Sequence, residues 1–318
     1  MNIALDIMGG DYAPEQALIG VRQYLDEVPD SSVHLLLIGD PDAAAPFMLQ
    51  LEHHNGRFTL VPATETIGMH EHPTKALKEK PDSSIAVGFG ALARGKADAF
   101  ISAGNTGAMM VGAMYTVKAI EGILRPTIAS PLPRADGKFN LLLDVGINAD
   151  CKPEHLVQFA SLGSLYMQHV MGTESPRVGL LNLGEEEGKG NILAQATYPL
   201  LKESTMINFV GNVEGRDMFG DKADVIVCEG FVGNVAMKMA ENFHDMLVTQ
   251  RGIQDSFLDN FNYEIYGGTP ILGINSPVII GHGISPALAF RNMIDVARRI
   301  IASNLIDAFR LHFAPAAE

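Results

Sequence analysis

The segment Asn182–Asn191, NLGEEEGKGN, comes close to a phosphate-binding loop. In the nucleotide-binding form, G-x-x-x-x-G-K-[ST], backbone N–H groups surround the phosphate, the lysine contacts it and the hydroxyl binds Mg²⁺. Here Gly184, Gly188 and Lys189 are present, but the spacing is one residue short and Gly190 stands in place of the hydroxyl. The segment therefore offers a phosphate-loop lysine without the metal ligand, in a loop crowded by three glutamates.

A second segment rich in small residues, SAGNTGAMMVG (102–112), opens a helical pattern. Gly104, Asn105, Thr106 and Gly107 could surround an anion with N–H groups and a hydroxyl, because the first N–H groups of a helix have no partner within it. The same residue types also cap helices without binding any ligand. The sequence leaves both interpretations open.

Two further turns carry polar side chains at the ends of apolar runs. In CEGFVGNVAMK (228–238), Gly233 and Asn234 lie at a strand-to-helix turn, where the amide of Asn234 could donate to a carbonyl oxygen or a phosphate, or cap the helix. In DVGIN, Asp144 and Asn148 are expected in the same layer, where an isolated aspartate more often organises a loop.

Thiols and imidazoles give weaker signals. Cys228 could accept an acyl group, but a lone cysteine after an apolar strand is more often packed in the core. His70 and His72 in MHEHP lack the spacing of a zinc-binding H-E-x-x-H motif, so a solvated loop is favoured over a metal site. His282 lies at the end of a strand. No G-x-S-x-G motif supports a hydrolase triad.

One local pattern positions these residues: a short apolar run ends at glycine or asparagine, and a helical pattern often follows. Continuous apolar strands that alternate with helices indicate a parallel sheet covered on both faces, and ligands of such folds bind beyond the carboxyl ends of the strands. The expected strands lie in 3–10, 35–40, 100–105, 141–146, 179–184, 207–212, 225–230 and 278–283, and the expected helices are 14–27, 84–95, 105–119, 153–170, 191–204, 231–250 and 285–312.

Composition narrows the class of protein. The chain has 318 residues, 47% of them hydrophobic, which predicts a globular protein with an extensive core. Its net charge of −14 argues against a nucleic-acid binder. Two cysteines are too few for a disulfide scaffold, and no apolar run approaches the ~20 residues of a membrane span. We therefore expect a cytoplasmic protein.

Together these segments resemble the PlsX-type phosphate acyltransferases of bacterial phospholipid synthesis. The resemblance rests on eight segments in the family's order: DIMGGDYAPE, SAGNTGA, LLLDVGIN, LLNLGEEEGKGN, FVGNVEGRD, CEGFVGNVAMK, YGGTPILG and IIGHG. It implies a three-layer α/β/α sandwich with a mostly parallel sheet, similar to phosphotransacetylases and isocitrate-dehydrogenase-like proteins. We expect a single domain over residues 1–318, with a helical dimerisation segment at about 235–262.

The resemblance also implies an activity. The family transfers a fatty acyl group reversibly from acyl carrier protein to inorganic phosphate, with no cofactor and no metal, which explains a phosphate loop without a magnesium ligand. Lys189 and Asn234 match the residues implicated in catalysis. The phosphate-binding candidates are Gly104, Asn105, Thr106, Gly107, Gly188 and Gly233, and the supporting candidates are Asp6, Asp11, Asp144, Asn148 and His282.

The chain departs from the family pattern in two places. Tyr12 stands where the family commonly has histidine. The segment 239–265 is shorter than the helical hairpin that many members carry for dimerisation and, in some, for contact with the membrane surface. The stretch 235–261 contains Lys238 and Arg251 against four acidic residues, whereas anionic membranes attract basic helices. We therefore expect membrane contact that is weak or absent, at most peripheral to the inner face.

The expected partners follow from the activity. They are acyl carrier protein, inorganic phosphate, a downstream membrane glycerol-3-phosphate acyltransferase and a second copy of the chain. An acidic carrier needs a local basic patch, for which Arg291, Arg298 and Arg299 are candidates. Two alternatives remain: a coenzyme A-dependent short-chain phosphate acyltransferase, and a phosphate- or nucleotide-binding regulatory module without catalysis.

Overall fold

The computed structural model describes residues 1–29 and 32–314, whose contacts group into two compact units. The first contains residues 1–119 and 263–306, and the second contains residues 120–262 together with the residues after 306. Each unit carries its own part of the predicted site, so each is described by itself. The prediction of a single domain stays a prediction.

The first unit is built on strands in the order β3-β2-β1-β4-β11-β10, all parallel except for the antiparallel pair β10–β11. Its strands are β1 (Asn2–Asp6), β2 (His34–Gly39), β3 (Phe58–Pro62), β4 (Ala99–Ser102), β10 (Thr269–Leu272) and β11 (Val278–Ile280). Its helices are α1 (Glu15–Glu27), α2 (Pro41–Met48), α3 (Pro73–Glu79), α4 (Ser84–Ala93), α5 (Thr106–Gly112), α10 (Tyr263–Tyr266) and α11 (Ala287–Ala302), with short turns η1 (Leu49–His54) and η2 (Ala113–Val117).

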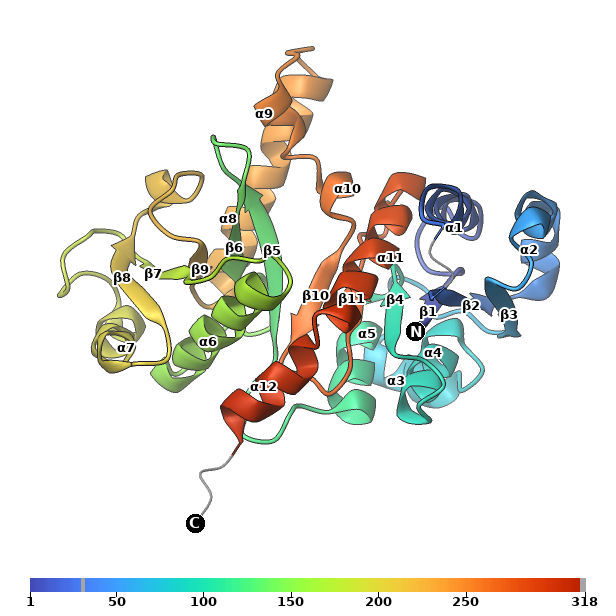
Figure 1. Ribbon diagram of the computed structural model, residues 1–318, viewed down its shortest axis with the longest axis horizontal. Coiled ribbons are helices and arrows are strands. Elements are labelled where there is room, and N and C mark those ends of the chain that lie inside the picture. The colour runs from blue at the N-terminus through green and yellow to red at the C-terminus, as the bar shows by residue number, and fades with distance from the viewer. Residues whose placement is uncertain (30–31, 315–318) are drawn as a thin grey trace. The chain divides into compact units, whose positions relative to one another are not determined.

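Helices cover both faces of this first sheet. Figure 1 shows α1 and α11 on one side of the strands and α3, α4 and α5 on the other. The central strands β1 and β4 are buried almost throughout, which is why they read as continuous apolar runs rather than as alternating patterns. The predicted three-layer α/β/α arrangement with a mostly parallel sheet is confirmed.

The second unit follows the same plan, with strand order β5-β6-β9-β7-β8 and one antiparallel pair, β5–β6. Its strands are β5 (Thr127–Pro133), β6 (Phe139–Leu143), β7 (Arg177–Leu181), β8 (Asn208–Val213) and β9 (Val225–Val227). Its helices are α6 (Pro153–His169), α7 (Ile192–Glu203), α8 (Gly230–Phe243), α9 (Ser256–Asp259) and most of α12 (Leu305–Phe313), with turns η3 (Gly215–Asp217) and η4 (His244–Thr249). Figure 1 shows α6 in front of these strands and α8 behind them.

Three helical predictions are divided in the structure, and one of them is 105–119, which continues from α5 into η2 at Ala113. The expected helix 285–312 is interrupted between α11 and α12, where Asn304 has a positive φ of 54° that a right-handed helix cannot contain. The expected helix 231–250 continues from α8 into η4, a wider helical turn. All three divisions lie outside the residues predicted to form the site.

Candidate functional site

The loop between β7 and α7 holds Lys189 by its backbone and leaves its side chain free. The side-chain amide of Asn182 donates to the carbonyl of Lys189 at 3.1 Å, and Gln195 donates to the carbonyls of Gly188 and Gly190 at 3.1 and 3.0 Å. Gly190 has φ +98°, and a Cβ there would lie 2.3 Å from Oδ1 of Asn182. The ammonium group of Lys189 is exposed and makes no ion pair within the described chain.

Lysines from other elements neutralise two of the three glutamates in this loop. Glu185 pairs with Lys222 at 2.7 Å, and Glu187 pairs with Lys202 at 2.8 Å. The hydrogen bond from each lysine to its glutamate raises the pKa of that lysine, so both lysines stay charged near neutral pH. An anion can therefore approach Lys189 although the loop sequence is acidic.

Asp144 organises the loop that follows β6. Its Oδ1 accepts from the N–H groups of Gly146 and Ile147 at 3.0 and 3.1 Å, and its Oδ2 accepts from the backbone and side-chain nitrogens of Asn148 at 2.7 and 2.6 Å. Asn148 also donates to the carbonyl of Pro126 at 2.9 Å. Both side chains are buried, so the structure gives them the loop-organising role that the sequence left open.

This loop in turn positions Asn234. The Nδ2 of Asn234 donates to the carbonyl of Val145 at 3.1 Å, and its second N–H has no partner within the described chain. A Cβ on Gly233 would lie 1.8 Å from the carbonyl oxygen of Asp144, so α8 can approach the loop only through a glycine. The N–H of Gly233 donates to Glu229 within the helix and is not available to a phosphate.

The start of α8 already holds an anion, the carboxylate of Glu229. Its oxygens accept from the N–H groups of Phe231 at 2.6 Å and Val232 at 3.1 Å. These are the donors that a phosphate at this helix start would use. Glu229, not Asn234, is thus the N-cap, and the free ammonium of Lys189 is the stronger candidate for an anion contact.

In the first unit, Asp6 and Ser102 form hydrogen bonds that engage the backbone of the turn before α5. Ser102 donates to Asp6 at 2.7 Å, and the N–H of Gly104 donates to the hydroxyl of Ser102 at 2.9 Å. Asp6 is buried, and burial raises the pKa of its carboxyl group although hydrogen bonds from Ser102, Ser84 and the N–H of Met8 oppose the rise. Asp6 therefore holds this turn through Ser102, and its supporting role in the site stays a prediction.

Asn105 caps α5 and ties a neighbouring loop to it. Its Oδ1 accepts from the N–H of Ala108 at 3.0 Å, while its Nδ2 donates to the carbonyls of Gly68 and Glu71 at 2.9 and 3.0 Å. A Cβ on Gly107 would lie 2.3 Å from the ring of Pro73. The exposed hydroxyl of Thr106 and the N–H groups of Thr106 and Gly107 make no hydrogen bond within the described chain, so this turn keeps donors that an anion could use.

The last two supporting candidates also lie in the first unit. Asp11 is exposed, and its N–H donates to the carbonyl of Gly283 at 2.7 Å. The ring of His282 packs against Tyr263 with centroids 4.7 Å apart. Lys189, Gly188, Gly233, Asn234, Asp144 and Asn148 belong to the second unit instead. No hydrogen bond or ion pair joins Lys189 to Asn234 in the described part of the chain.

Neither cysteine is a ready nucleophile. Burial raises the pKa of Cys151 to about 11, and burial also raises the pKa of Cys228 well above its ordinary value. Both are therefore protonated thiols at neutral pH, whereas the thiolate is the reactive form. Cys228 contacts the carbonyl of Asp144 at 3.7 Å, as the packing interpretation predicted.

A histidine cluster that the sequence did not single out has metal-ligand chemistry. The Nε2 atoms of His53 and His54 lie 3.3 and 2.7 Å from Oδ1 of Asp26, and the hydrogen bond with His54 lowers the pKa of that carboxyl group. A second cluster, Glu185, Glu214 and Asp217, contains carboxylates alone, and Lys222 pairs with both Glu185 and Asp217.

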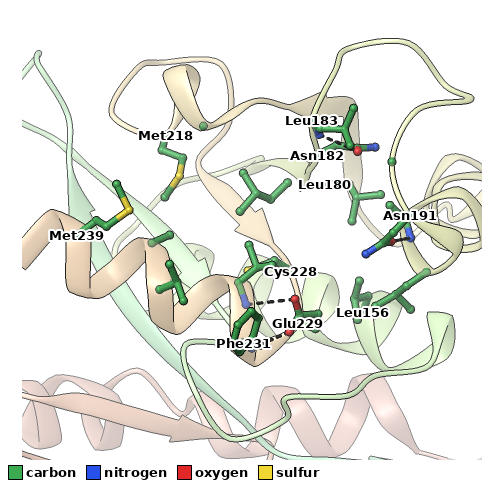
Figure 2. Close-up of a pocket in the computed structure, with 18 of the residues that line it drawn as sticks. Leu156, Leu180, Asn182, Leu183, Asn191, Met218, Cys228, Glu229, Phe231 and Met239 are labelled. Atoms are coloured by element: carbon green, nitrogen blue, oxygen red, sulfur yellow. Dashed lines mark hydrogen bonds between the residues drawn. The ribbon is translucent and has the colours of Figure 1, made fainter.

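The second unit also contains an apolar groove of about 650 Å³ (Figure 2). Most of its lining comes from one face of α8 and from the strands and helices opposite. Asn182, Leu183, Gly190 and Asn191, from the loop that carries Lys189, border it. Sequence reasoning missed this groove because its walls come from segments far apart in the chain.

Comparison with known proteins decides the family. The model of the fatty acid synthesis protein family matches residues 1–308. The chain is 41% identical to a phosphate acyltransferase of Dictyoglomus turgidum, over 95% of this chain and 94% of that protein. It is 42% identical to a phosphate acyltransferase of Desulforamulus reducens, over 98% of this chain and 96% of that protein. The chain belongs to this family. The predicted resemblance to the phosphate acyltransferases is confirmed.

Solved structures of similar fold support the architecture. The EutD phosphotransacetylase from Staphylococcus aureus matches with a TM-score of 0.63 and 18% identity, over 94% of each chain. A branched-chain phosphotransacylase from Enterococcus faecalis V583 matches with a TM-score of 0.62 and 15% identity, over 94% of this chain and 98% of that one. Because the sequence identities are this low, these two structures show only that the chain shares their fold. No helix in the described part of the chain combines the length and apolar character needed to cross a membrane.

Proposed function

We propose that this protein transfers an acyl group from a thioester to inorganic phosphate and so forms an acyl phosphate for phospholipid synthesis. The observation that carries the proposal is the free ammonium of Lys189, held on a fixed loop that borders an apolar groove. Membership of the phosphate acyltransferase family supports the same reaction.

The reaction requires an anion to attack an electron-rich carbonyl. Phosphate is already anionic at neutral pH, so the protein must offset its charge and hold an oxygen about 3–3.5 Å from the thioester carbon. Lys189 would supply that charge. A bond forms between the phosphate oxygen and the carbonyl carbon, the carbon–sulfur bond breaks, and the departing thiolate takes up a proton.

Asn234 would act on the charge that develops during attack. Attack places negative charge on the carbonyl oxygen, and a positioned N–H donor stabilises it. The second N–H of the Asn234 amide is free to donate, while the first is fixed on Val145. The buried hydrogen bonds of Asp144 fix the loop that contains Val145, and Val145 in turn orients the Asn234 amide. The donor is therefore positioned before substrate binds.

We propose acyl carrier protein as the acyl donor. The predicted docking arginines are already engaged: Arg291 pairs with Glu27, and Arg298 and Arg299 pair with Asp295. An acidic carrier would therefore compete with these carboxylates. The remaining proposed partners are a second copy of the chain and a membrane glycerol-3-phosphate acyltransferase that consumes the product. Membrane contact would be weak or absent, so the protein would work in the cytoplasm.

The test is incubation with palmitoyl-acyl carrier protein and phosphate, with acyl phosphate trapped by hydroxylamine. We expect an acyl hydroxamate that depends on both substrates and persists after EDTA treatment. Faster turnover of short coenzyme A thioesters than of the carrier-protein thioester would favour the coenzyme A-dependent alternative. Phosphate binding without thioester consumption would favour the regulatory module.

A further inference from the structure

One face of α8 forms a wall of the groove at helical spacing. Phe231, Val235 and Met239 follow one another at intervals of four residues, and Phe243 continues the row. This spacing places all four side chains on one side of the helix. The opposite walls come from α6, β7 and the segment after η3, through Leu156, Leu180, Leu181, Met218 and Phe219. At 1.5 Å per residue, the 14 residues of α8 give the groove about 20 Å of wall.

The two ends of the groove differ in chemistry. Figure 2 shows Asn182 and Asn191 toward one end, and Met218 and Met239 toward the other. The polar end lies at the loop that carries Lys189. Phe219 and Phe243 follow the two methionines along the chain and also line the groove, and their rings contact Phe261 with centroids 5.1 and 5.7 Å away, so an aromatic cluster lies at the apolar end.

Several wall residues remain exposed although they are apolar. Leu183 is 73% exposed, Phe231 66% and Met239 61%. Leu156 and Leu180, on the floor, are 2% and 1% exposed, so the groove has a packed base and open walls. A contiguous apolar surface of this kind marks a binding site for an apolar ligand or partner. Its volume falls within the range of about 300–1,000 Å³ that small-molecule sites occupy.

We propose that this groove holds the hydrocarbon chain of the acyl donor, with the carbonyl end at the Lys189 loop and the methyl end at the aromatic cluster. The inference rests on the proposed acyl transfer. A linear ligand with one polar end fits the arrangement, because the polar lining groups, Asn182, Asn191 and Glu229, come from the loop and from the start of α8.

The length of the groove then limits how many methylene groups of the acyl chain it can bury. Each buried methylene contributes to binding by an amount that corresponds to about a fourfold gain in kcat/KM. We expect log kcat/KM to rise with acyl length until the chain reaches Phe219 and Phe243, and to level off beyond that length. A bulky side chain placed midway along α8 should move this plateau to shorter chains.

The test substitutes Ala236, which lines the groove, with phenylalanine. The matched control is Ala196→Phe, the same change at an exposed position of α7 outside the lining. With thioesters from 4 to 16 carbons, we expect A236F to lose at least tenfold in kcat/KM for the longest chain and to keep its rate for the shortest. A196F should match the parent protein. Equal profiles for the two variants would overturn the proposal.

A binding measurement separates this proposal from the proposed function. The fluorescent fatty acid cis-parinaric acid should bind the unaltered chain and A196F, and bind A236F more weakly. The smaller change Ala236→Leu should fall between them, which keeps the test informative if A236F does not fold. If the unaltered chain consumes no thioester but these binding differences hold, acyl transfer fails and the groove stands. If A236F changes the oligomer mass but neither profile nor binding, the groove belongs to a second copy and the proposal is wrong.

Discussion

At the scale of single residues, the neighbours of Lys189, more than the loop motif, determine whether its ammonium group can bind an anion. A lysine beside three glutamates would ordinarily pair with one of them. Here Lys202 and Lys222 hold Glu187 and Glu185, which leaves Lys189 able to meet an external anion. Asn182 and Gln195 fix its backbone from two sides, so little ordering of the loop remains to be done when phosphate binds.

Lys189→Ala should lower kcat/KM for phosphate by about 10²–10³-fold, the cost of removing one group that stabilises developing charge in other enzymes. The fold should be unaffected, because the side chain is exposed and unpaired. Steady-state kinetics with circular dichroism checks this, and Lys238→Ala, which removes an exposed lysine paired with Glu241, is the control. A raised phosphate KM with unchanged turnover would restrict Lys189 to ground-state binding.

Asn234→Ala should lower kcat by about 10²–10³-fold and change the phosphate KM little, because its proposed donor acts on charge that appears only during attack. Asn234→Asp keeps the volume but loses the amide donor, so it should be as impaired. Initial rates over a range of phosphate concentrations measure both quantities. If either variant raised KM and kept kcat, Asn234 would be a binding residue.

At the scale of elements, a buried ion network joins the ends of three strands in the second unit. Asp224, before β9, accepts from Arg134 at 3.0 Å and from Arg177 at 3.0 Å through two of its guanidinium nitrogens. Burial alone would raise the pKa of Asp224, but the hydrogen bonds and charges of the two arginines outweigh it and hold that pKa below its ordinary value. The network therefore ties β5, β7 and β9 together at one end, and the far ends of β7 and β9 lead to the Lys189 and Asn234 loops.

Asp224→Asn should lower the free energy of unfolding by about 3 kcal/mol near neutral pH, because Arg177 loses its carboxylate partner and the buried Arg134 keeps only Asp136. The folded pKa lies below the unfolded value of about 3.9, so the carboxylate's contribution is present above about pH 4 and is lost as pH falls through the folded pKa. Urea unfolding of both proteins from pH 7 to pH 3 should show the difference shrinking. The control Asp307→Asn, an exposed pair with Arg310, should change stability by less than about 1 kcal/mol.

The sequence predicted eight strands and missed three, for a reason that the residues make plain. The eight are continuous apolar runs that end at glycine or asparagine, and all are present in the structure. The missed strands β3, β5 and β10 each contain proline, at Pro62, at Pro131 and Pro133, and at Pro270. Proline lacks the N–H that a central strand needs, so these three segments depart from the usual pattern of a buried strand.

The sequence predicted only part of the candidate site. Polar residues at strand ends could be found, because parallel strands deliver them to the same edge of a sheet. Their partners could not be found. The donation of Gln195 to two carbonyls of the Lys189 loop, and the capping of α8 by Glu229, depend on loop geometry that spacing does not determine. The apolar residues of α8 can be read from the sequence, but only the structure shows that they face Leu156 and Leu180 across the groove.

At the scale of the whole molecule, the net charge of −14 limits which partners can approach without a local basic surface. The basic residues of the described chain are mostly engaged within it: Arg134, Arg177, Arg291, Arg298 and Arg299 all pair with carboxylates. Association through an apolar surface does not require such a basic surface. The segment predicted for dimerisation, at about 235–262, divides in two, because Val235, Met239 and Phe243 line the groove, while Met246 and Ile253 lie outside its lining and are exposed.

We therefore expect a homodimer that uses the outer part of this segment, because a two-fold contact pairs an apolar patch with itself. Light scattering should give about twice the monomer mass of 34.2 kDa. Met246→Glu should reduce that mass and leave the dependence of the rate on acyl length unchanged, because Met246 does not line the groove. Flotation with anionic vesicles at physiological salt should leave the protein in the bottom fraction, since acidic residues outnumber Lys238 and Arg251 in this segment. A monomer that floats with the vesicles would contradict both expectations.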